Sequence, residues 1–115
     1  MAQTLQHQII AAALALIASE EHWAQGTLAQ TKHGAICLWN DGEAHRFCAV
    51  GALAKVATDL IGDVAQAGSL ATEIAKHVLI ANERAALSLA EINDVEGHAA
   101  IVAMFRRALQ LWADL

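Results

Sequence analysis

The residues with the clearest chemical potential surround a cysteine in the stretch HRFCAVGAL. Helical spacing of apolar residues begins at this point, so Cys48 is expected in the first turn of a helix, where free amides and the helix dipole lower a thiol pKa. A cysteine-dependent hydrolase or transferase also needs a base and a group that orients the base. His98 is a candidate base and Asn93 or Asp94 a candidate orienting group, so Cys48 is a candidate nucleophile.

The same cysteine also suits a packing role. Gly51 and Ala52 follow Cys48 within one helical turn, and such a strip of small residues lets another backbone approach closely. His45, a second candidate base, lies only three residues before the cysteine. No local signature of the well-known cysteine proteases surrounds Cys48. We therefore favour packing and keep catalysis as the alternative.

Two segments share the pattern Asn-Asp-x-Glu-x-His, at residues 40–45 and 93–98. Carboxylates and imidazoles in this pattern are possible ligands for a divalent metal. The candidate ligands are Asp41, Glu43, His45, Asp94 and His98. Asn-Asp pairs are more often turn and cap residues, because their short side chains accept backbone hydrogen bonds. We favour that interpretation and expect no metal site and no cofactor.

Apolar spacing predicts four or five helices around these residues. The first should run from an N-cap at Thr4 to about Glu21, and a later one should start near Phe47 and stop at Gly62. Ser69 is a candidate cap for a third helix, and Ser88 with Glu91 has the spacing of a capping box. Whether residues 70–92 form one helix or two stays open. A broad apolar stripe predicts the last helix, which should dock across the first: Ile101, Met104, Phe105, Ala108, Leu111, Trp112 and Leu115.

Between the first two helices, residues 22–34 lose the helical period and contain two glycines, which predicts a loop whose Trp23 turns back onto the core. The Asp41-Gly42 step then predicts a tight turn joining two short strands within residues 35–47. This β-hairpin must pack on the helices to be stable. Its packing face carries either Ile36, Leu38 and Phe47 or, on the other side, Trp39.

Composition bounds the remaining possibilities. The chain has 115 residues, 57% of them hydrophobic and 17% charged, and a net charge of -5. We expect one domain, residues 1–115, without nucleic-acid or anionic-membrane binding, because Arg106-Arg107 is the one basic pair. Two cysteines without a convincing export signal favour free thiols and a cytoplasmic location. The low charged fraction favours surplus apolar helix surface, and hence a protein partner or homo-oligomer.

The stretches HWAQG, FCAVGAL and IND, followed by the helix HAAIVAMFRRAL, form an ordered set. They resemble an uncharacterised family of small bacterial and phage proteins, a domain of unknown function, with a Trp and Gly loop, a Cys-x-x-Gly-Ala step and an Asn-Asp pair. The matching positions are Trp23, Gly26, Cys48, Gly51, Ala52, Asn93 and Asp94. Ile92 departs from the pattern, since the family often has tryptophan there. The resemblance implies a shared fold and no established activity.

Together these observations predict a mainly helical α+β domain with one β-hairpin. The function we favour is a non-enzymatic binding or protein-interaction module, with Trp23, Asn93 and Asp94 as candidate binding residues. The alternative is a cysteine-dependent hydrolase or transferase.

Overall fold

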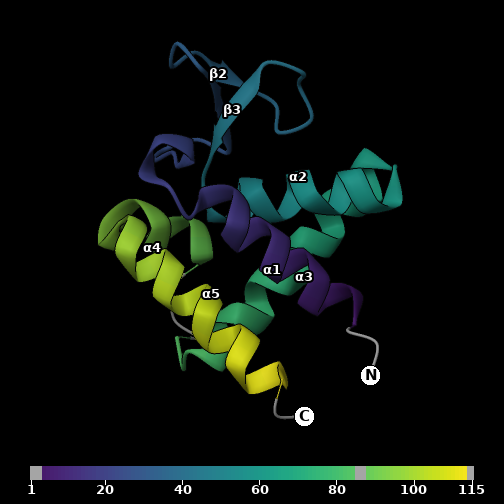
Figure 1. Ribbon diagram of the computed structural model, residues 1–115, viewed down its shortest axis with the longest axis vertical. Coiled ribbons are helices and arrows are strands. Elements are labelled where there is room, and N and C mark those ends of the chain that lie inside the picture. The colour runs from purple at the N-terminus through teal and green to yellow at the C-terminus, as the bar shows by residue number, and fades with distance from the viewer. Residues whose placement is uncertain (1–3, 85–87, 114–115) are drawn as a thin grey trace.

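The computed structural model describes residues 4–84 and 88–113 and has the predicted mainly helical α+β fold (Figure 1). Its elements are α1 (Leu5–Ile17), the 3-10 helix η1 (Glu20–His22), β1 (Ala29–Thr31), β2 (Ile36–Cys37), β3 (Ala44–Phe47), α2 (Ala49–Ile61), α3 (Val64–Ala81), α4 (Leu89–Glu96) and α5 (His98–Ala113). Residues 70–92 thus contain two helices, α3 and α4, rather than one.

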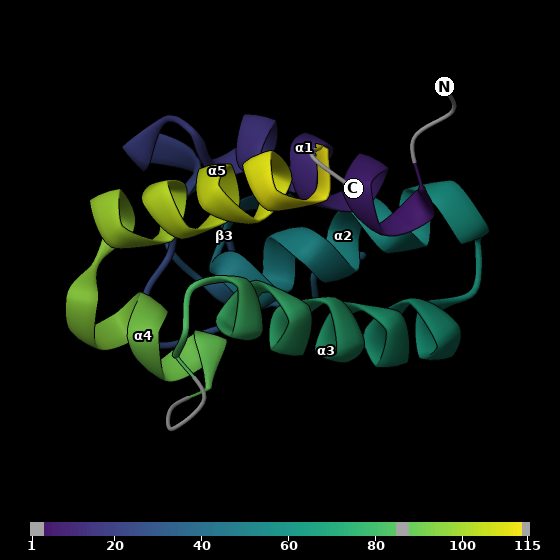
Figure 2. The ribbon, with the colours of Figure 1, turned by 90° about the horizontal axis from the view of Figure 1, so that it is seen from below.

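The helices pack in layers around α2. Figure 2 shows α1 and α5 side by side on one side of α2, with α3 on the other, and α4 closing one end between α3 and α5. Contact between α1 and α5 confirms the predicted docking of the last helix. Completely buried residues fill the space between the layers, among them Ile10, Leu53, Ile74, Ile101 and Phe105. Trp23 packs against this core, as predicted.

Three helix ends follow local sequence signals. The Thr4 side chain accepts a hydrogen bond from the backbone N–H of His7, and Ser88 accepts one from Glu91, so both are N-caps. Gly62 ends α2 in a left-handed conformation with φ of 80°.

Three helix boundaries differ from prediction. The first helix ends at Ile17 instead of Glu21, and a separate 3-10 turn follows. The third helix begins six residues earlier than expected, because Asp63 caps it by accepting from the N–H of Gln66, which places Ser69 inside the helix. The second helix begins at Ala49, so Cys48 is its N-cap rather than the first-turn residue expected from the sequence.

The sheet differs from the predicted hairpin. Both runs flanking Asp41-Gly42 form strands, but each pairs with β1, giving the antiparallel order β2-β1-β3. Asp41 and Gly42 therefore lie in a connection between the two edges of the sheet. The hairpin that forms joins β1 to β2, and β1 lies within residues 22–34, for which the sequence predicts a loop.

The inner side of the sheet region packs on the helices through Phe47 of β3 and through Trp39, which lies in the connection after β2. Phe47 is buried, and the indole N–H of Trp39 donates to the Thr58 hydroxyl at 3.0 Å. Ile36 and Leu38, by contrast, are exposed. The packing face is therefore the one that carries Trp39, and Phe47 belongs to this face rather than to that of Ile36 and Leu38.

Both cysteines are free thiols, as expected. In the described ranges, none of the helices combines the length and apolar character needed to cross a membrane. In the last helix the predicted apolar residues up to Ala108 are buried, whereas Leu111 is exposed. The Trp112 side chain and Leu115 lie outside the described residues.

Candidate functional site

Asn93 on α4 is the centre of a buried junction between three segments. It is completely buried, and among the described residues it is the one polar side chain in the core. Its Oδ1 accepts hydrogen bonds from the indole N–H of Trp23 at 2.8 Å and the backbone N–H of Ala49 at 2.9 Å. Its Nδ2 donates to the Ala24 carbonyl at 2.9 Å and to Asp94 Oδ1 at 3.1 Å. All four hydrogen-bonding positions of the amide are used.

Asp94 extends the junction to the surface. Its Oδ1 also accepts from the backbone N–H of Gly26 at 2.8 Å, and its backbone carbonyl accepts from Gln25 Nε2 at 3.1 Å. Gly26 has φ of 77°, a left-handed conformation that favours glycine. The Trp23–Gly26 segment is thereby tied to α4, although nearly 70 residues separate them in sequence.

Cys48 caps α2 from the buried side of this junction. Its Sγ accepts from the N–H of Gly51 at 3.3 Å, and its own N–H donates to the Leu28 carbonyl at 3.2 Å. A Cβ on Gly51 would lie 1.9 Å from the same carbonyl oxygen, so only glycine fits. The close backbone approach expected for Gly51 therefore takes place, against the segment that leads into β1.

The thiol of Cys48 is held in its neutral form. Burial raises the pKa of Cys48, and the negative charge of Asp94 adds to this, against opposing hydrogen bonds from the Gly51 and Val50 amides. A reactive cysteine needs a lowered pKa and access to solvent. Cys48 is 3% exposed, so its environment is the opposite of the one that activates a nucleophile.

His98 serves a different part of the fold. Its Nε2 lies 2.6 Å from the Ile17 carbonyl, its Nδ1 lies 4.0 Å from Glu20 Oε1, and its ring contacts Trp23 at a centroid distance of 5.5 Å. Among the described residues, no hydrogen bond joins His98 to Cys48 or to Asn93. The imidazole links the end of α1 to the start of α5. Its Nε2 is engaged with the Ile17 carbonyl, so this nitrogen is not available to accept a proton from a nucleophile.

The two Asn-Asp-x-Glu-x-His segments also have separate structural roles. Asp41 Oδ1 accepts from the N–H of Glu43 at 2.8 Å, the turn role expected of an Asn-Asp pair. The His45 ring packs on His22 at a centroid distance of 4.6 Å, and the His45 carbonyl contacts His22 Nδ1. Across residues 4–84 and 88–113, no three His, Cys, Asp or Glu side chains are grouped to hold a metal ion.

The short motifs around Trp23, Cys48 and Asn93 thus meet at one junction, and the chain matches a known family along nearly its whole length. Residues 1–111 match the family of unknown function DUF6197. The chain belongs to this family. No curated protein matches the chain, and no solved structure matches it. Membership in DUF6197 confirms the expected resemblance to a domain of unknown function and brings no activity with it.

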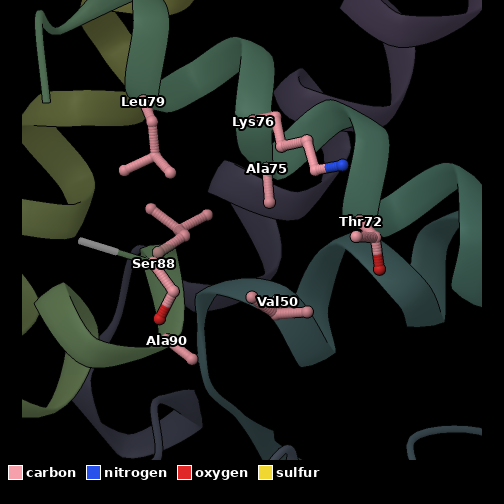
Figure 3. Close-up of a pocket in the computed structure, with 8 residues that line it drawn as sticks. Val50, Thr72, Ala75, Lys76, Leu79, Ser88 and Ala90 are labelled. Carbon is pink, nitrogen blue, oxygen red and sulfur yellow. The ribbon is translucent and has the colours of Figure 1, made fainter. Parts of the chain in front are cut away.

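Two features of this DUF6197 protein are not predicted from its sequence. One is a groove of about 280 Å³ between the start of α2, one side of α3 and the first turn of α4 (Figure 3). The other is the Nε of Arg46, which is enclosed without a hydrogen-bond acceptor. The spacing of Thr72, Ala75, Lys76 and Leu79 on one helix face was a usable signal for the groove. Nothing local marks Arg46, because its surroundings depend on strand pairing.

Proposed function

We propose that this chain is a non-enzymatic interaction module that associates with a second copy of itself through the outer face of its sheet. The observation that carries the proposal is a pair of exposed apolar side chains at the edge of the sheet, Ile36 in β2 and Leu38 directly after that strand. Ile36 is 77% exposed and Leu38 is 66% exposed. Figure 1 shows that the sheet projects on one side of the helices. Neighbouring exposed apolar residues of this kind mark contact surfaces.

Arg46 places a cation on the same face. Gln30 of β1 pairs with Ile36 on one side and with Arg46 on the other, so the three residues form a row across the sheet. Adjacent strands lie about 4.8 Å apart, which puts the ends of this row about 10 Å apart. The Arg46 Nε has no acceptor, and the ion pairs formed among the described residues do not include Arg46. The guanidinium of Arg46 can therefore pair with a carboxylate of a partner.

A second copy can supply that carboxylate. The connection between β2 and β3 carries two exposed acids, Asp41 and Glu43, and no ion pair in the described part of the chain uses either. In a twofold dimer each contact occurs twice, so Arg46 of each copy would face the acidic connection of the other. The sheet face is thus self-complementary, with apolar, cationic and anionic groups together.

The exposed apolar residues of the helices support this choice of surface less well. Leu60, Ile80 and Val95 are exposed on α2, α3 and α4 respectively. Residues spread over three helices are normal for a soluble protein. We therefore propose the sheet face as the contact surface, rather than the surplus apolar helix surface expected from composition.

Light scattering coupled to gel filtration tests the proposal over roughly a hundredfold range of protein concentration, because a dimer must strengthen by mass action. We expect a small, reversible interface, with the average mass rising toward that of a dimer. The double variant Ile36→Ser/Leu38→Ser should stay monomeric. The matched control Leu60→Ser/Ile80→Ser, which changes exposed residues on α2 and α3, should behave as the parent.

Charge variants provide a second readout. Glu43→Arg should weaken the dimer, because it sets two cations against each other, whereas Glu73→Arg on α3 should leave it unchanged. Added salt should also weaken the dimer, since exposed ion pairs are screened. A parent chain that stays monomeric over the whole range, or controls that lose as much dimer as the sheet variants, would refute the proposal.

A further inference from the structure

We infer that the groove between α2, α3 and α4 binds a short apolar chain that ends in a carboxylate. Its walls are mainly apolar, with Val50 from α2, Ala75 and Leu79 from α3, and Leu89 and Ala90 from α4 (Figure 3). A volume of about 280 Å³ is slightly below the usual range of small-molecule pockets, about 300–1,000 Å³. At about 30 Å³ per heavy atom, the space a liquid water takes, the groove holds roughly nine such atoms.

The groove is polar at one end and apolar at the other. Thr72, Ala75, Lys76 and Leu79 follow one another along the same side of α3. From Thr72 to Leu79 the helix rises about 10 Å, at 1.5 Å per residue. Figure 3 shows Thr72 and Lys76 toward the end of the groove opposite Leu79. A ligand with one charged end and one apolar end matches this arrangement.

Lys76 is the lining side chain with N–H groups to offer a ligand. The Thr72 hydroxyl donates to the Gly68 carbonyl at 3.1 Å, and the Ser88 hydroxyl contacts Glu91 Oε1 at 3.3 Å while accepting from the Glu91 N–H. Both hydroxyl protons are therefore used. An ammonium group offers three donors and no acceptor, which selects an anion.

The charge of Lys76 is not neutralised inside the groove. No acidic residue is among those that line it. Lys76 Nζ lies 3.7 Å from Glu73 Oε1, and both side chains are about two-thirds exposed, at 65% and 63%. Solvent-exposed pairs of this kind contribute little free energy, so a ligand carboxylate can compete for the ammonium.

Octanoate has about the right size for the groove, and its binding can be followed by the NMR shifts of the groove residues. The comparison probes are 1-octanol and octylamine, which have the same chain length but no carboxylate. We expect octanoate to shift Ala75, Leu79 and Leu89 at concentrations up to about 10 mM, where a millimolar site is nearly saturated. Octanol should bind about fivefold more weakly, and octylamine more weakly still, because the ion pair is lost or becomes repulsive.

Variants separate the charge from the cavity. Lys76→Met should reduce octanoate affinity about fivefold and leave octanol affinity unchanged. Lys55→Met is the matched control, because Lys55 also pairs with an acid, Asp59 at 2.9 Å, but lies on α2 away from the groove. Ala90→Leu should block both ligands by filling the groove, and unfolding curves will verify that it is folded.

The outcomes distinguish the steps of the inference. Equal binding of octanoate and octanol, unaffected by Lys76→Met, would overturn the carboxylate selectivity and leave an apolar groove. Absence of shifts at the groove residues, or shifts that Ala90→Leu does not remove, would overturn the site. Ile36→Ser/Leu38→Ser should bind octanoate like the parent, so this result does not depend on whether the sheet face forms a dimer.

Discussion

Replacing Asn93 by leucine, a residue of similar size, should remove much of the stability of this fold. The leucine would leave the Ala49 N–H and the Ala24 carbonyl without partners, and both belong to buried residues. A buried polar group that loses its partner costs about 1–3 kcal/mol, so the two together cost about 2–6 kcal/mol. The Trp23 indole N–H also loses its acceptor, at a smaller cost because it is only partly buried. We expect a loss of about 4 kcal/mol, a large part of the 5–15 kcal/mol typical of a domain.

Urea unfolding followed by far-UV circular dichroism measures this loss at equilibrium. Asn40→Leu is the control, because Asn40 is exposed and the same substitution there should change stability by no more than about 0.5 kcal/mol. Trp23→Phe removes the indole donor together with part of the ring that packs on the core and on His98. In the double variant with Asn93→Leu its effect should be smaller than in the parent, because the two side chains share one hydrogen bond, while the lost ring packing costs the same in both.

A loss below about 1 kcal/mol for Asn93→Leu would refute this reasoning, since it is less than the cost of one stranded group. Additive effects of Trp23→Phe and Asn93→Leu would also contradict it, because they would show that the hydrogen bond contributes nothing. Either result would mean that the junction is not what joins the Trp23 segment, α2 and α4.

Three further predictions follow from the geometry. Gly51→Ala should destabilise the fold by about 1–3 kcal/mol or more through the backbone clash described above. Gly68→Ala should stabilise it by up to about 1 kcal/mol, because the added methyl meets only ordinary contacts and alanine favours a helix. Urea unfolding of the two variants compares these effects. Iodoacetamide should not label Cys48 before the chain unfolds. Because burial raises the pKa of this thiol only in the folded chain, the free energy of unfolding should fall as pH rises above about 8.5. Rapid labelling of the folded chain would contradict both predictions. The hydrogen bond from Arg84 lowers the pKa of Glu96. This pair therefore stabilises the fold above the unfolded pKa of about 4.3, and the stabilisation is lost at lower pH. Thermal melts of Glu96→Gln should show a smaller loss of stability in acid than those of the parent.

Local signals predicted the helices well, because each depends on residues a few positions apart. Thr4, Gly62 and Ser88 mark helix ends through contacts that span three or four residues. Ser69 is not the cap of the third helix, because Asp63 caps that helix six residues earlier. In the fold, Gly68 lies within α3, and a Cβ there would meet only the Trp39 ring, at 3.7 Å.

The sheet could not be predicted in the same way, because pairing between strands is not a local property. The Asp-Gly step at Asp41 favours a tight turn, but Gly42 does not have the positive φ angle that such a turn needs. β1 contains only Ala29, Gln30 and Thr31, which give little strand signal. Its position is fixed instead by the carbonyl of the preceding Leu28, which lies against Gly51 and accepts from Cys48.

The candidate site shows the same division between local and distant information. The sequence drew attention to Cys48, Asn93, Asp94 and Trp23, and the structure brings Trp23, Asn93 and Asp94 together with the first turn of α2. The residue types suggested catalysis because an amide, a carboxylate and a thiol are also the parts of a cysteine enzyme. Which role they serve depends on burial and on partners far away in sequence, and neither can be obtained from spacing.

The hydrogen bonds of the junction leave the Asn93 amide without a free group for a ligand, so binding is expected at other surfaces. Asn93 uses its full capacity inside the protein, Cys48 is buried with a raised pKa, and His98 contacts the Ile17 carbonyl. Groups whose interactions are satisfied internally cannot bind a ligand without destabilising the fold. Arg46 lacks an acceptor for its Nε, and Lys76 has only an exposed acid beside it. Binding at these two cations, each next to apolar surface, would add interactions and break none that the fold requires.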